Sequence, residues 1–350
     1  MEPVATSASP SVKRSHHGIL VLDKPAGPSS HEVVAWVRRA IGERRVGHCG
    51  TLDPAATGVL VVCVGEATKL VAWLTDDDKA YEATICLGRS TTTADSQGET
   101  LQTAEVSEAD LARAVAAVAA LHGPLLLSPP NVSAVRVDGV RAHARVRAGE
   151  SFTLPTRTML VHRAHLDAVD ASHRALSVTF EVGKGTYIRS LAEHLGRLVD
   201  LPAHLGSLRR TRTGAFAIAS AAAAGPICAV SAGFRPDGKP RHRLEPADGA
   251  DREQLAARLR DALIPPHEAA PQGWPRAQVV DTVKFARLCN GVDFDPSEVG
   301  LEDPAASGAP FALFGGPPGS TAWVVAALDP GPPARVRPVR VLELGPPANA

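Results

Sequence analysis

Apolar positions near the start of the chain alternate between strand-like and helix-like spacing. Residues 19–22 and 59–64 are nearly continuous runs of mostly branched apolar side chains, which is typical of buried strands. Between them, the capping-box sequence SSHE at residues 29–32 precedes apolar residues at helical spacing, and Gly42 provides a C-terminal stop. We therefore predict a strand, a helix and a second buried strand, with residues 44–54 as a loop.

The pattern that follows predicts a larger domain and then a smaller one. Further strands are predicted at 81–87, 133–137, 159–166, 176–182, 207–212 and 216–218, and helices at 67–74, 107–121 and 186–199. This mixture predicts an α+β domain over residues 18–225, with a mixed, mainly antiparallel central sheet flanked by helices. Residues 226–275 are predicted to be a linker with one amphipathic helix at 252–263. From residue 276 to 350, short strands and Pro/Gly turns predict a small β-barrel.

Composition narrows the class of protein. A length of 350 residues suits two domains, and 21% charged with 44% hydrophobic residues exclude a wholly disordered chain. No apolar run approaches the ~20 residues of a membrane span, so no membrane partner is expected. Residues 1–17 have no apolar segment and are predicted to be a disordered leader, not a signal peptide. The five cysteines are widely spaced without a C-x-x-C motif, which argues against a disulfide scaffold or a cysteine zinc site and favours a cytoplasmic protein.

Charge is balanced over the whole chain but not along it. The 37 basic and 37 acidic residues cancel, whereas residues 131–220 carry 13 Lys/Arg against 7 Asp/Glu, and residues 74–110 carry 2 against 9. A basic middle segment suits a polyanionic partner such as nucleic acid. It fits equally well a chain that is simply rich in arginine, so charge alone leaves both interpretations open.

The main candidate for a catalytic loop is residues 47–58, with the sequence GHCGTLDPAATG. Glycines and a proline give this loop an unusual backbone just before a predicted buried strand, and catalytic groups are often on such loops. Its one carboxylate, Asp53, lies between Leu52 and Pro54. A carboxylate in partly apolar surroundings acts as a nucleophile or base when a cation keeps it ionised. The alternative is that Asp53 only caps a turn before Pro54.

This loop and four other motifs, in the same order, resemble the TruB family of tRNA pseudouridine synthases. The sequence GHCGTLDPAATGVLVV at 47–62 is similar to the family signature GH-x-GTLDP-x-A-x-G-x-L. The other motifs are KPAGPSS at 24–30, KAYEA at 79–83, GTYIRSL at 185–191 and LRRTR at 208–212. The resemblance covers residues 18–220, and a weaker one relates residues 276–350 to a PUA-like RNA-binding domain.

The resemblance implies a pseudouridine synthase catalytic domain that acts on uridine at position 55, in the T-loop of tRNA. In that reaction the N1–C1′ glycosidic bond is broken, the uracil rotates and C5 is joined to C1′, after the base has flipped out of the folded loop. The resemblance further implies that no cofactor or metal ion is needed. The implied partner is tRNA, held by its T-loop and acceptor stem, and the implied enzyme is monomeric and cytoplasmic.

Three residues match the family's reacting groups. Asp53 matches the catalytic aspartate, which acts as a nucleophile or as the base that starts glycal formation. Arg189 matches the arginine that pairs with this aspartate and keeps it ionised. Tyr81 matches the tyrosine that stacks on the flipped uracil and whose hydroxyl helps to remove the C5 proton.

Other residues match positions around the family's pocket. Three of them match residues that border the flipped base or contact RNA: His48, Tyr187 and Leu208. Four match positions of phosphate contact or site support: Lys24, Arg209, Arg210 and Arg212. Taken singly, each of these also fits an ordinary core or solvated position. The chain departs from the family at Val132 and His143, where tyrosine is usual, which leaves the shape of the pocket open but not the reaction class.

Three other functions were compared with the stand-alone tRNA enzyme. A guide-RNA-dependent synthase of the dyskerin type shares the GTLDP loop and a PUA domain, but this chain lacks Lys-rich tails. A non-catalytic tRNA chaperone has no need to keep Asp53, Tyr81 and Arg189 together. A small-molecule hydrolase needs a second acid beside Asp53, and the acidic run at 76–78 fits a solvated helix end better.

Overall fold

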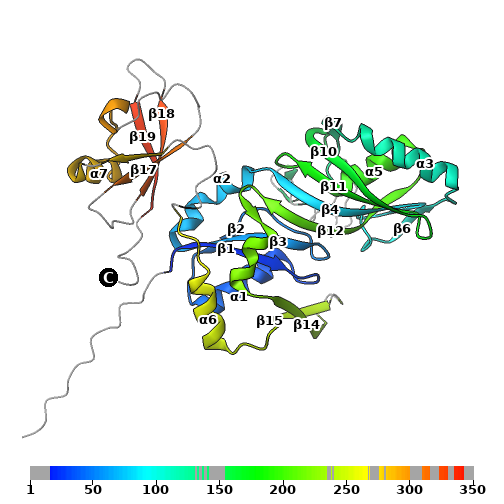
Figure 1. Ribbon diagram of the computed structural model, residues 1–350, viewed down its shortest axis with the longest axis horizontal. Helices are drawn as coiled ribbons and strands as arrows, with labels where there is room; N and C mark the ends of the chain where they lie inside the picture. The colour runs from blue at the N-terminus through cyan, green and yellow to red at the C-terminus, as the bar shows by residue number, and fades with distance from the viewer. Residues whose placement is uncertain are drawn as a thin grey trace, which may run out of the picture.

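The computed structural model (Figure 1) describes residues 16–130, 132–133, 136–137, 140–141, 154–234, 238, 240–266, 268, 276–279, 281–299, 310–315, 323–329 and 335–342. Nearly all of the predicted leader, residue 131, and His143 lie outside these ranges. None of the described helices is long and apolar enough to cross a membrane.

A nine-stranded sheet forms the centre of the molecule. Seven strands follow the order β1-β3-β12-β4-β11-β10-β7, while β2 pairs with β3 and β13 with β12. All neighbours are antiparallel except β3 and β12. The strands are β1 (Gly18–Lys24), β2 (Val46–His48), β3 (Thr57–Val64), β4 (Lys79–Leu87), β7 (Gly123–Leu127), β10 (Arg157–Asp170), β11 (Ala175–Val182), β12 (Ala203–Thr213) and β13 (Phe216–Ala217). The predicted α+β fold with a mixed, mainly antiparallel sheet is therefore confirmed.

Alternate residues of the strands point apolar side chains to opposite faces of the sheet, and helices pack on these side chains. The helix α1 (Ser30–Ile41) packs Val33 and Val37 on Leu20 of β1 and Leu60 of β3. The intervening residues of β1 and β3 face the opposite way, toward the 3₁₀ helix η1 (Gly65–Leu70) and α2 (Val71–Asp76). At the other end of the sheet, α3 (Glu108–Ala117) and α5 (Ile188–Leu198) share a core with β4, β10 and β11.

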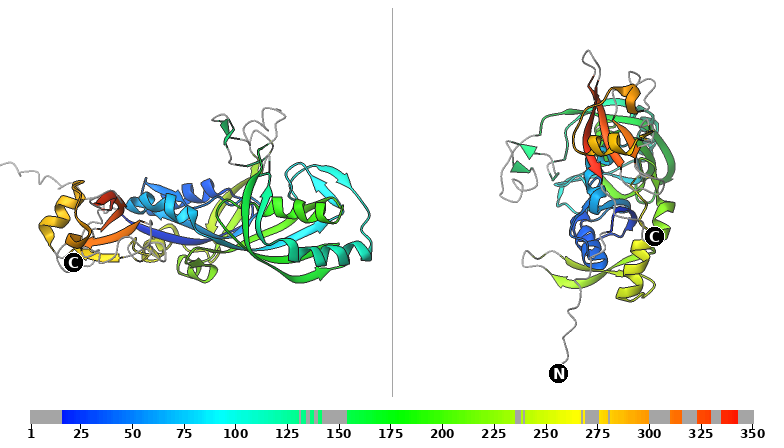
Figure 2. Two further views of the ribbon diagram at one scale, coloured as in Figure 1. Left: turned by 90° about the horizontal axis from the view of Figure 1, so that it is seen from above. Right: turned by 90° about the vertical axis from the view of Figure 1, so that its left-hand side faces the viewer.

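Two small β-pairs lie outside this sheet and belong to the larger domain. The strands β5 (Arg89–Thr91) and β6 (Thr100–Thr103) enclose a short loop beside β12. The pair β8 (Arg136–Val137) and β9 (Val140–Arg141) stands away from the body of the molecule (Figure 2).

Residues 227–261 differ from the predicted linker. They form a hairpin of β14 (Ile227–Phe234) and β15 (Pro240–Pro246), followed by α6 (Arg252–Asp261), which packs on α1. The helix was predicted, but the hairpin was not. The apolar side chains in the outer half of the hairpin are exposed, and that of Phe234 is 77% exposed. Buried and exposed residues therefore do not alternate along these strands, and the sequence lacks the alternating pattern that predicts a strand.

The C-terminal residues form a second sheet with the order β16-β17-β18-β19. Its elements are β16 (Arg276–Val279), α7 (Thr282–Cys289), β17 (Phe311–Gly315), β18 (Trp323–Asp329) and β19 (Arg335–Leu342). The predicted strands are present, but the described residues form an open sheet and not the closed barrel that was predicted. Short alternating strands look the same in an open and a closed sheet, because closure depends on pairing between strands far apart in sequence.

Candidate active site

The loop between β2 and β3 carries Asp53 and is fixed to the sheet by its backbone. Gly58, where the loop enters β3, has φ +99°, and a Cβ there would lie 2.1 Å from the carbonyl oxygen of Arg210. Only glycine allows β3 to approach β12 this closely. From the other side, Ser30 of α1 accepts the Leu52 N–H (2.9 Å) and donates to the Leu52 carbonyl (3.1 Å). The residue before Asp53 is thus clamped to a helix.

Asp53 meets the guanidinium of Arg189, as predicted for a catalytic pair. Arg189 Nη2 lies 3.0 Å from Asp53 Oδ2 and 3.3 Å from Oδ1. The Arg189 side chain is 5% exposed, whereas that of Asp53 is 39% exposed. The arginine is therefore enclosed by protein, and the carboxylate keeps an open side on which a substrate can approach.

The Arg189 guanidinium is held in place by groups besides Asp53. It donates to the carbonyls of Thr93 (3.1 Å) and Val132 (3.0 Å), and its Nη1 lies 3.9 Å from Oδ2 of Asp95. Asp95 is itself oriented by the Thr93 hydroxyl (2.6 Å) and the Gln97 N–H (3.0 Å). Sequence analysis missed Asp95. The available signal was an isolated carboxylate in the turn-rich segment TTTADSQG between two short strands.

Burial and charge act in opposite directions on Asp53. Burial raises the pKa of the Asp53 carboxyl above its ordinary value, and the Asp95 carboxylate adds to this; Arg189 and Lys24 oppose it. The carboxylate is therefore more basic than a solvated aspartate, while the cation beside it favours its ionised form.

Lys24 and Arg210 tie the loop to the sheet from beneath. The fully buried Lys24 ammonium donates to the carbonyls of Pro25 (2.9 Å), Pro28 (2.8 Å) and Pro54 (3.1 Å). The buried Arg210 guanidinium donates to the carbonyls of Val59 (2.8 Å) and Gly50 (3.1 Å). Two roles were predicted for Lys24 and Arg210, and this geometry favours structural support of the loop over contact with phosphates.

A substitution separates these two roles for Lys24. We expect Lys24→Met to slow any reaction at Asp53, because three carbonyls lose their donor and the loop that carries Asp53 loosens. Each unsatisfied buried acceptor costs about 1–3 kcal/mol. RNA affinity should change little, since the ammonium does not reach the surface. The check is a rate and an affinity measured on the same preparation. A large loss of affinity at an unchanged rate would instead indicate phosphate contact.

The other two arginines of the LRRTR motif lie nearer the surface. Arg209 forms a two-pronged ion pair with Asp23 at 2.7 and 3.1 Å, and Arg212 lies 3.2 Å from Glu181. Each side chain is 36% exposed. Their guanidinium groups are engaged by carboxylates of the same sheet but remain within reach of a ligand.

Tyr81 and Leu208 lie on neighbouring strands, against the same core as the loop. Tyr81 of β4 is 8% exposed and stands opposite Phe180 of β11. It belongs to the cluster that contains Leu52 of the loop, and Leu208 packs against this cluster while only partly buried. In the described part of the chain, the Tyr81 hydroxyl has no hydrogen-bond partner. This arrangement places an aromatic ring and an aliphatic side chain together beside the loop.

Tyr187 and His48 adjoin in sequence the elements that carry Arg189 and Asp53. Tyr187 immediately precedes α5, and the Arg157 guanidinium lies 4.9 Å from its ring centre. The His48 ring meets His31 edge to face, with their centres 5.2 Å apart. Burial, together with His31 and Arg210, lowers the pKa of His48 to about 4. His48 is therefore neutral near pH 7 and can contact a ligand by packing or hydrogen bonding, not by charge.

The described residues offer no metal site. No three His, Cys, Asp or Glu side chains come together there in a way that could hold a metal ion.

Comparison with known proteins agrees with this fold and site. A family model described as TruB family pseudouridylate synthase (N terminal domain) matches residues 38–188. The tRNA pseudouridine synthase B of Thermobifida fusca (strain YX) is 48% identical over 211 residues, which are 59% of this chain and 72% of that protein. That of Rhodococcus jostii (strain RHA1) is 47% identical over 204 residues, 57% of this chain and 67% of that protein.

Solved structures share the fold at lower identity. The crystal structure of a Cbf5-Nop10-Gar1 complex contains a chain with a TM-score of 0.57 and 24% identity, over 89% of this chain and 78% of that one. The structure of an H/ACA RNP bound to a substrate RNA containing 2′-deoxyuridine gives a TM-score of 0.55 and 23% identity, over 89% of this chain and 77% of that one. At this identity, the likeness concerns the fold alone.

The central sheet, with a carboxylate loop between β2 and β3, is that of the pseudouridine synthases. More narrowly, the chain belongs to the TruB family of pseudouridylate synthases, because it spans 72% of a curated relative at 48% identity.

Proposed function

We propose that this chain isomerises uridine to pseudouridine in tRNA, at position 55 of the T-loop. The single observation that carries the proposal is the Asp53–Arg189 pair, in which an enclosed guanidinium orients a partly open carboxylate at 3.0 and 3.3 Å. Relatives at 48% and 47% identity are named tRNA pseudouridine synthase B, which supports tRNA as the substrate.

The proposed reaction needs an ionised Asp53 at the ribose of the flipped uridine. The carboxylate either adds to C1′ or removes the proton that starts glycal formation, and the N1–C1′ bond then breaks. The freed uracil rotates within the pocket and C5 bonds to C1′, while the Asp53–C1′ bond breaks or the glycal regains the proton it lost. The proton on C5 then leaves and N1 gains one, so the product is an isomer of the substrate. Arg189 keeps Asp53 ionised throughout, and no net oxidation or hydrolysis occurs.

Tyr81 has two separable roles in this scheme. A ring stacked on the uracil contributes about 1–3 kcal/mol to base binding, and a hydroxyl near C5 contributes to proton removal. We expect Tyr81→Phe to keep tRNA affinity and lose most of the single-turnover rate, and Tyr81→Leu to lose both. The measurements are rate, affinity and melting temperature for both variants. If the Phe variant retains the parental rate, the hydroxyl takes no part in the reaction.

Incubation of the purified chain with an unmodified tRNA transcript tests the proposed function directly. Pseudouridine should form at position 55 alone, as mapped at single-nucleotide resolution, without a guide RNA or a second protein. Activity only in the presence of a guide RNA would indicate a dyskerin-type enzyme. Binding without isomerisation would indicate a tRNA chaperone.

We further propose that the C-terminal sheet is a PUA-like module that contacts the acceptor stem. Support comes from its weak sequence resemblance and from Arg335, Arg337 and Arg340, all exposed on β19. The module is attached to the larger domain through Ala312, Val325 and Leu342, which share a core with β1 and β3. Because Asp53, Arg189 and Tyr81 all come from one chain, a monomer suffices for catalysis.

Charge reversal tests this module without exposing that shared core. We expect Arg335→Glu combined with Arg340→Glu to weaken tRNA binding while the rate at saturating tRNA stays near the parental value, since both residues lie far in sequence from the reacting groups. Binding isotherms and single-turnover rates give the comparison. Unchanged affinity would mean that β19 does not contact tRNA.

A further inference from the structure

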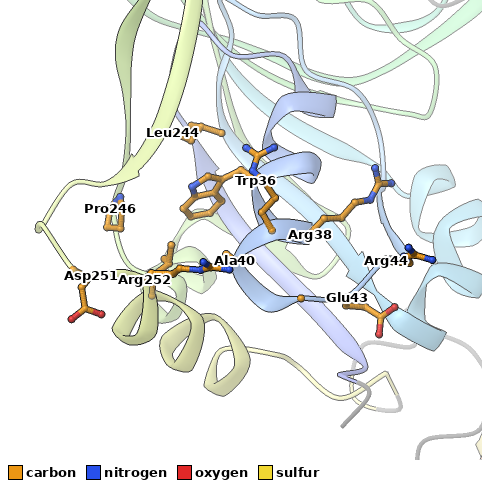
Figure 3. Close-up of a pocket in the computed structure, with 13 residues that line it drawn as sticks. Trp36, Arg38, Ala40, Glu43, Arg44, Leu244, Pro246, Asp251 and Arg252 are labelled. Carbon is orange, nitrogen blue, oxygen red and sulfur yellow. The ribbon is translucent and has the colours of Figure 1, made fainter. Parts of the chain in front are cut away.

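A cleft separate from the active site lies between α1 and the segment that contains β15 and α6 (Figure 3). Its volume is about 790 Å³, within the size range of ligand sites. The side chains of Trp36, Leu244 and Leu255 line it and are nearly buried, each 7% exposed. The cleft therefore has an apolar floor to which α1, β15 and α6 each contribute one largely buried side chain.

Four arginines surround this floor. Arg38 and Arg39 come from the end of α1, Arg44 from the loop that follows, and Arg252 from the start of α6. In Figure 3, Arg252 extends toward Ala40, and Arg38 and Arg44 lie across the cleft from it. Within the described ranges, none of the four forms an ion pair with a carboxylate.

The two acidic residues of the cleft are already engaged. A Glu43 oxygen accepts the Arg45 N–H at 2.9 Å. Asp251 caps α6 by accepting the N–H groups of Glu253 (2.8 Å) and Gln254 (2.9 Å). The cleft thus carries more positive than negative charge, and its guanidinium groups are available to an anion.

Two contacts of α1 relate the cleft to the strand that precedes the Asp53 loop. His31 and Arg38 are seven residues apart on α1, so they lie on the same face of the helix, about 10 Å apart along its axis. The His31 ring contacts His48, which borders the loop of Asp53. Arg38 donates to the carbonyl of Val46 (2.6 Å), at the start of the strand that ends in His48.

We propose that this cleft is a second RNA site, which binds the sugar–phosphate backbone of the same tRNA whose uridine is held at Asp53. The guanidinium groups suit phosphates, and the apolar floor suits the riboses between them. The shared face of α1 gives one RNA strand a route from the active site to the cleft. This inference rests on the proposed function, and it adds a contact that Arg252, Leu244 and Leu255 supply from outside the matched family region.

Charge reversal on both walls of the cleft tests the inference. The test variant combines Arg39→Glu with Arg252→Glu, and the matched control is Arg197→Glu, an exposed arginine of α5 without an ion pair to a described carboxylate. We expect the test variant to bind unmodified tRNA at least tenfold more weakly at ~0.1 M salt. Its log–log salt slope should fall by about 1.4–1.8, because each of the two lost phosphate contacts removes roughly 0.7–0.9. The control should match the parent, and the single-turnover rate at saturating tRNA should remain within about twofold of the parent for both.

The outcomes separate this inference from the proposed function. If the parent isomerises uridine but the test variant keeps both affinity and salt slope, the cleft does not bind RNA. If the parent does not isomerise uridine, the proposed function fails, whereas the salt slopes still report whether the cleft binds RNA.

A second measurement separates an RNA site from a small-molecule site. Uridine monophosphate is titrated against tryptophan fluorescence, with Trp36→Phe to assign the signal. No saturable response at micromolar concentrations is expected, since one phosphate engages only part of the cleft. The assignment would be overturned in favour of a free nucleotide by two results together: a saturable response to uridine monophosphate, and a tRNA affinity that the arginine substitutions leave unchanged. The milder pair Arg39→Gln and Arg252→Gln should give intermediate losses, and it replaces the Glu pair if that protein does not fold.

Discussion

Asp53→Asn is expected to abolish measurable isomerisation while tRNA binding persists. The amide keeps the shape of the side chain and can still accept from Arg189, but it can neither add to C1′ nor remove a proton. We expect a loss of roughly 4 kcal/mol of transition-state stabilisation, about a thousandfold in rate. Single-turnover formation of pseudouridine at more than a few per cent of the parental rate would contradict the role of Asp53.

The melting temperature provides a control for this variant. Because the pKa of Asp53 is raised in the folded protein, the folded state favours the uncharged carboxyl more than the unfolded state does. The contribution of Asp53 to the free energy of unfolding therefore falls as the pH rises from the ordinary aspartate pKa through the higher pKa of the folded state. A neutral amide avoids that cost but takes the carboxylate away from the enclosed Arg189, so we expect the melting temperature of Asp53→Asn at pH 7 to change little. Its inactivity could then not be attributed to unfolding.

The same shift sets the acid side of the rate profile. Only the ionised carboxylate reacts, so the single-turnover rate should fall as the pH drops through the folded pKa of Asp53. This fall should occur at a higher pH than a solvated aspartate would give. A rate that stays flat down to the ordinary aspartate range would contradict an ionised Asp53 in this environment.

Arg189→Ala is expected to damage activity and stability together. Removal of one partner from a buried ion pair costs about 3–5 kcal/mol, and the 39% exposure of Asp53 places the expected loss at the lower end of that range. Two carboxylates, Asp53 and Asp95, would then lie close together without the cation between them. Thermal unfolding and single-turnover rates measure the two effects.

Arg189→Lys separates charge from geometry. A lysine restores the positive charge, but it cannot contact Asp53 while it also serves the carbonyls of Thr93 and Val132 in the planar arrangement that the guanidinium allows. We expect partial recovery of stability and little recovery of rate. Full recovery of rate by lysine would mean that charge alone is required at this position.

Local patterns in the sequence predicted most of the elements, and motifs predicted the contact between Asp53 and Arg189. The capping box at Ser29 and Glu32 forms as expected, because it depends only on residues three apart. The Asp53–Arg189 contact joins positions 136 residues apart, and only the resemblance to a family linked them in advance. Asp95 was missed because its importance comes from a loop folding over Arg189, which no local spacing indicates.

The missed features share a physical cause. The burial of Lys24 and Arg210 could not be predicted from their residue types, since charged side chains are rarely enclosed unless carbonyls surround them. The β14–β15 hairpin lacks an alternating buried face, and the open form of the C-terminal sheet depends on pairing between distant strands. In each case the deciding contacts are nonlocal, and a periodic pattern along the chain does not record them.

The position of β12 between β3 and β4 has a consequence for how the protein is made. Both neighbours are synthesised more than a hundred residues before it, and they cannot complete their hydrogen bonding until it arrives. Until residue 213 has left the ribosome, β3 therefore presents an unpaired apolar edge, which is the kind of surface that chaperones shield and that aggregates. Arg210 arrives with β12 itself, whereas Arg189, Lys24 and Ser30 precede it in the chain. A nascent or prematurely terminated chain that ends before β12 thus lacks the guanidinium that ties the Asp53 loop to β3, and its loop has only part of its support.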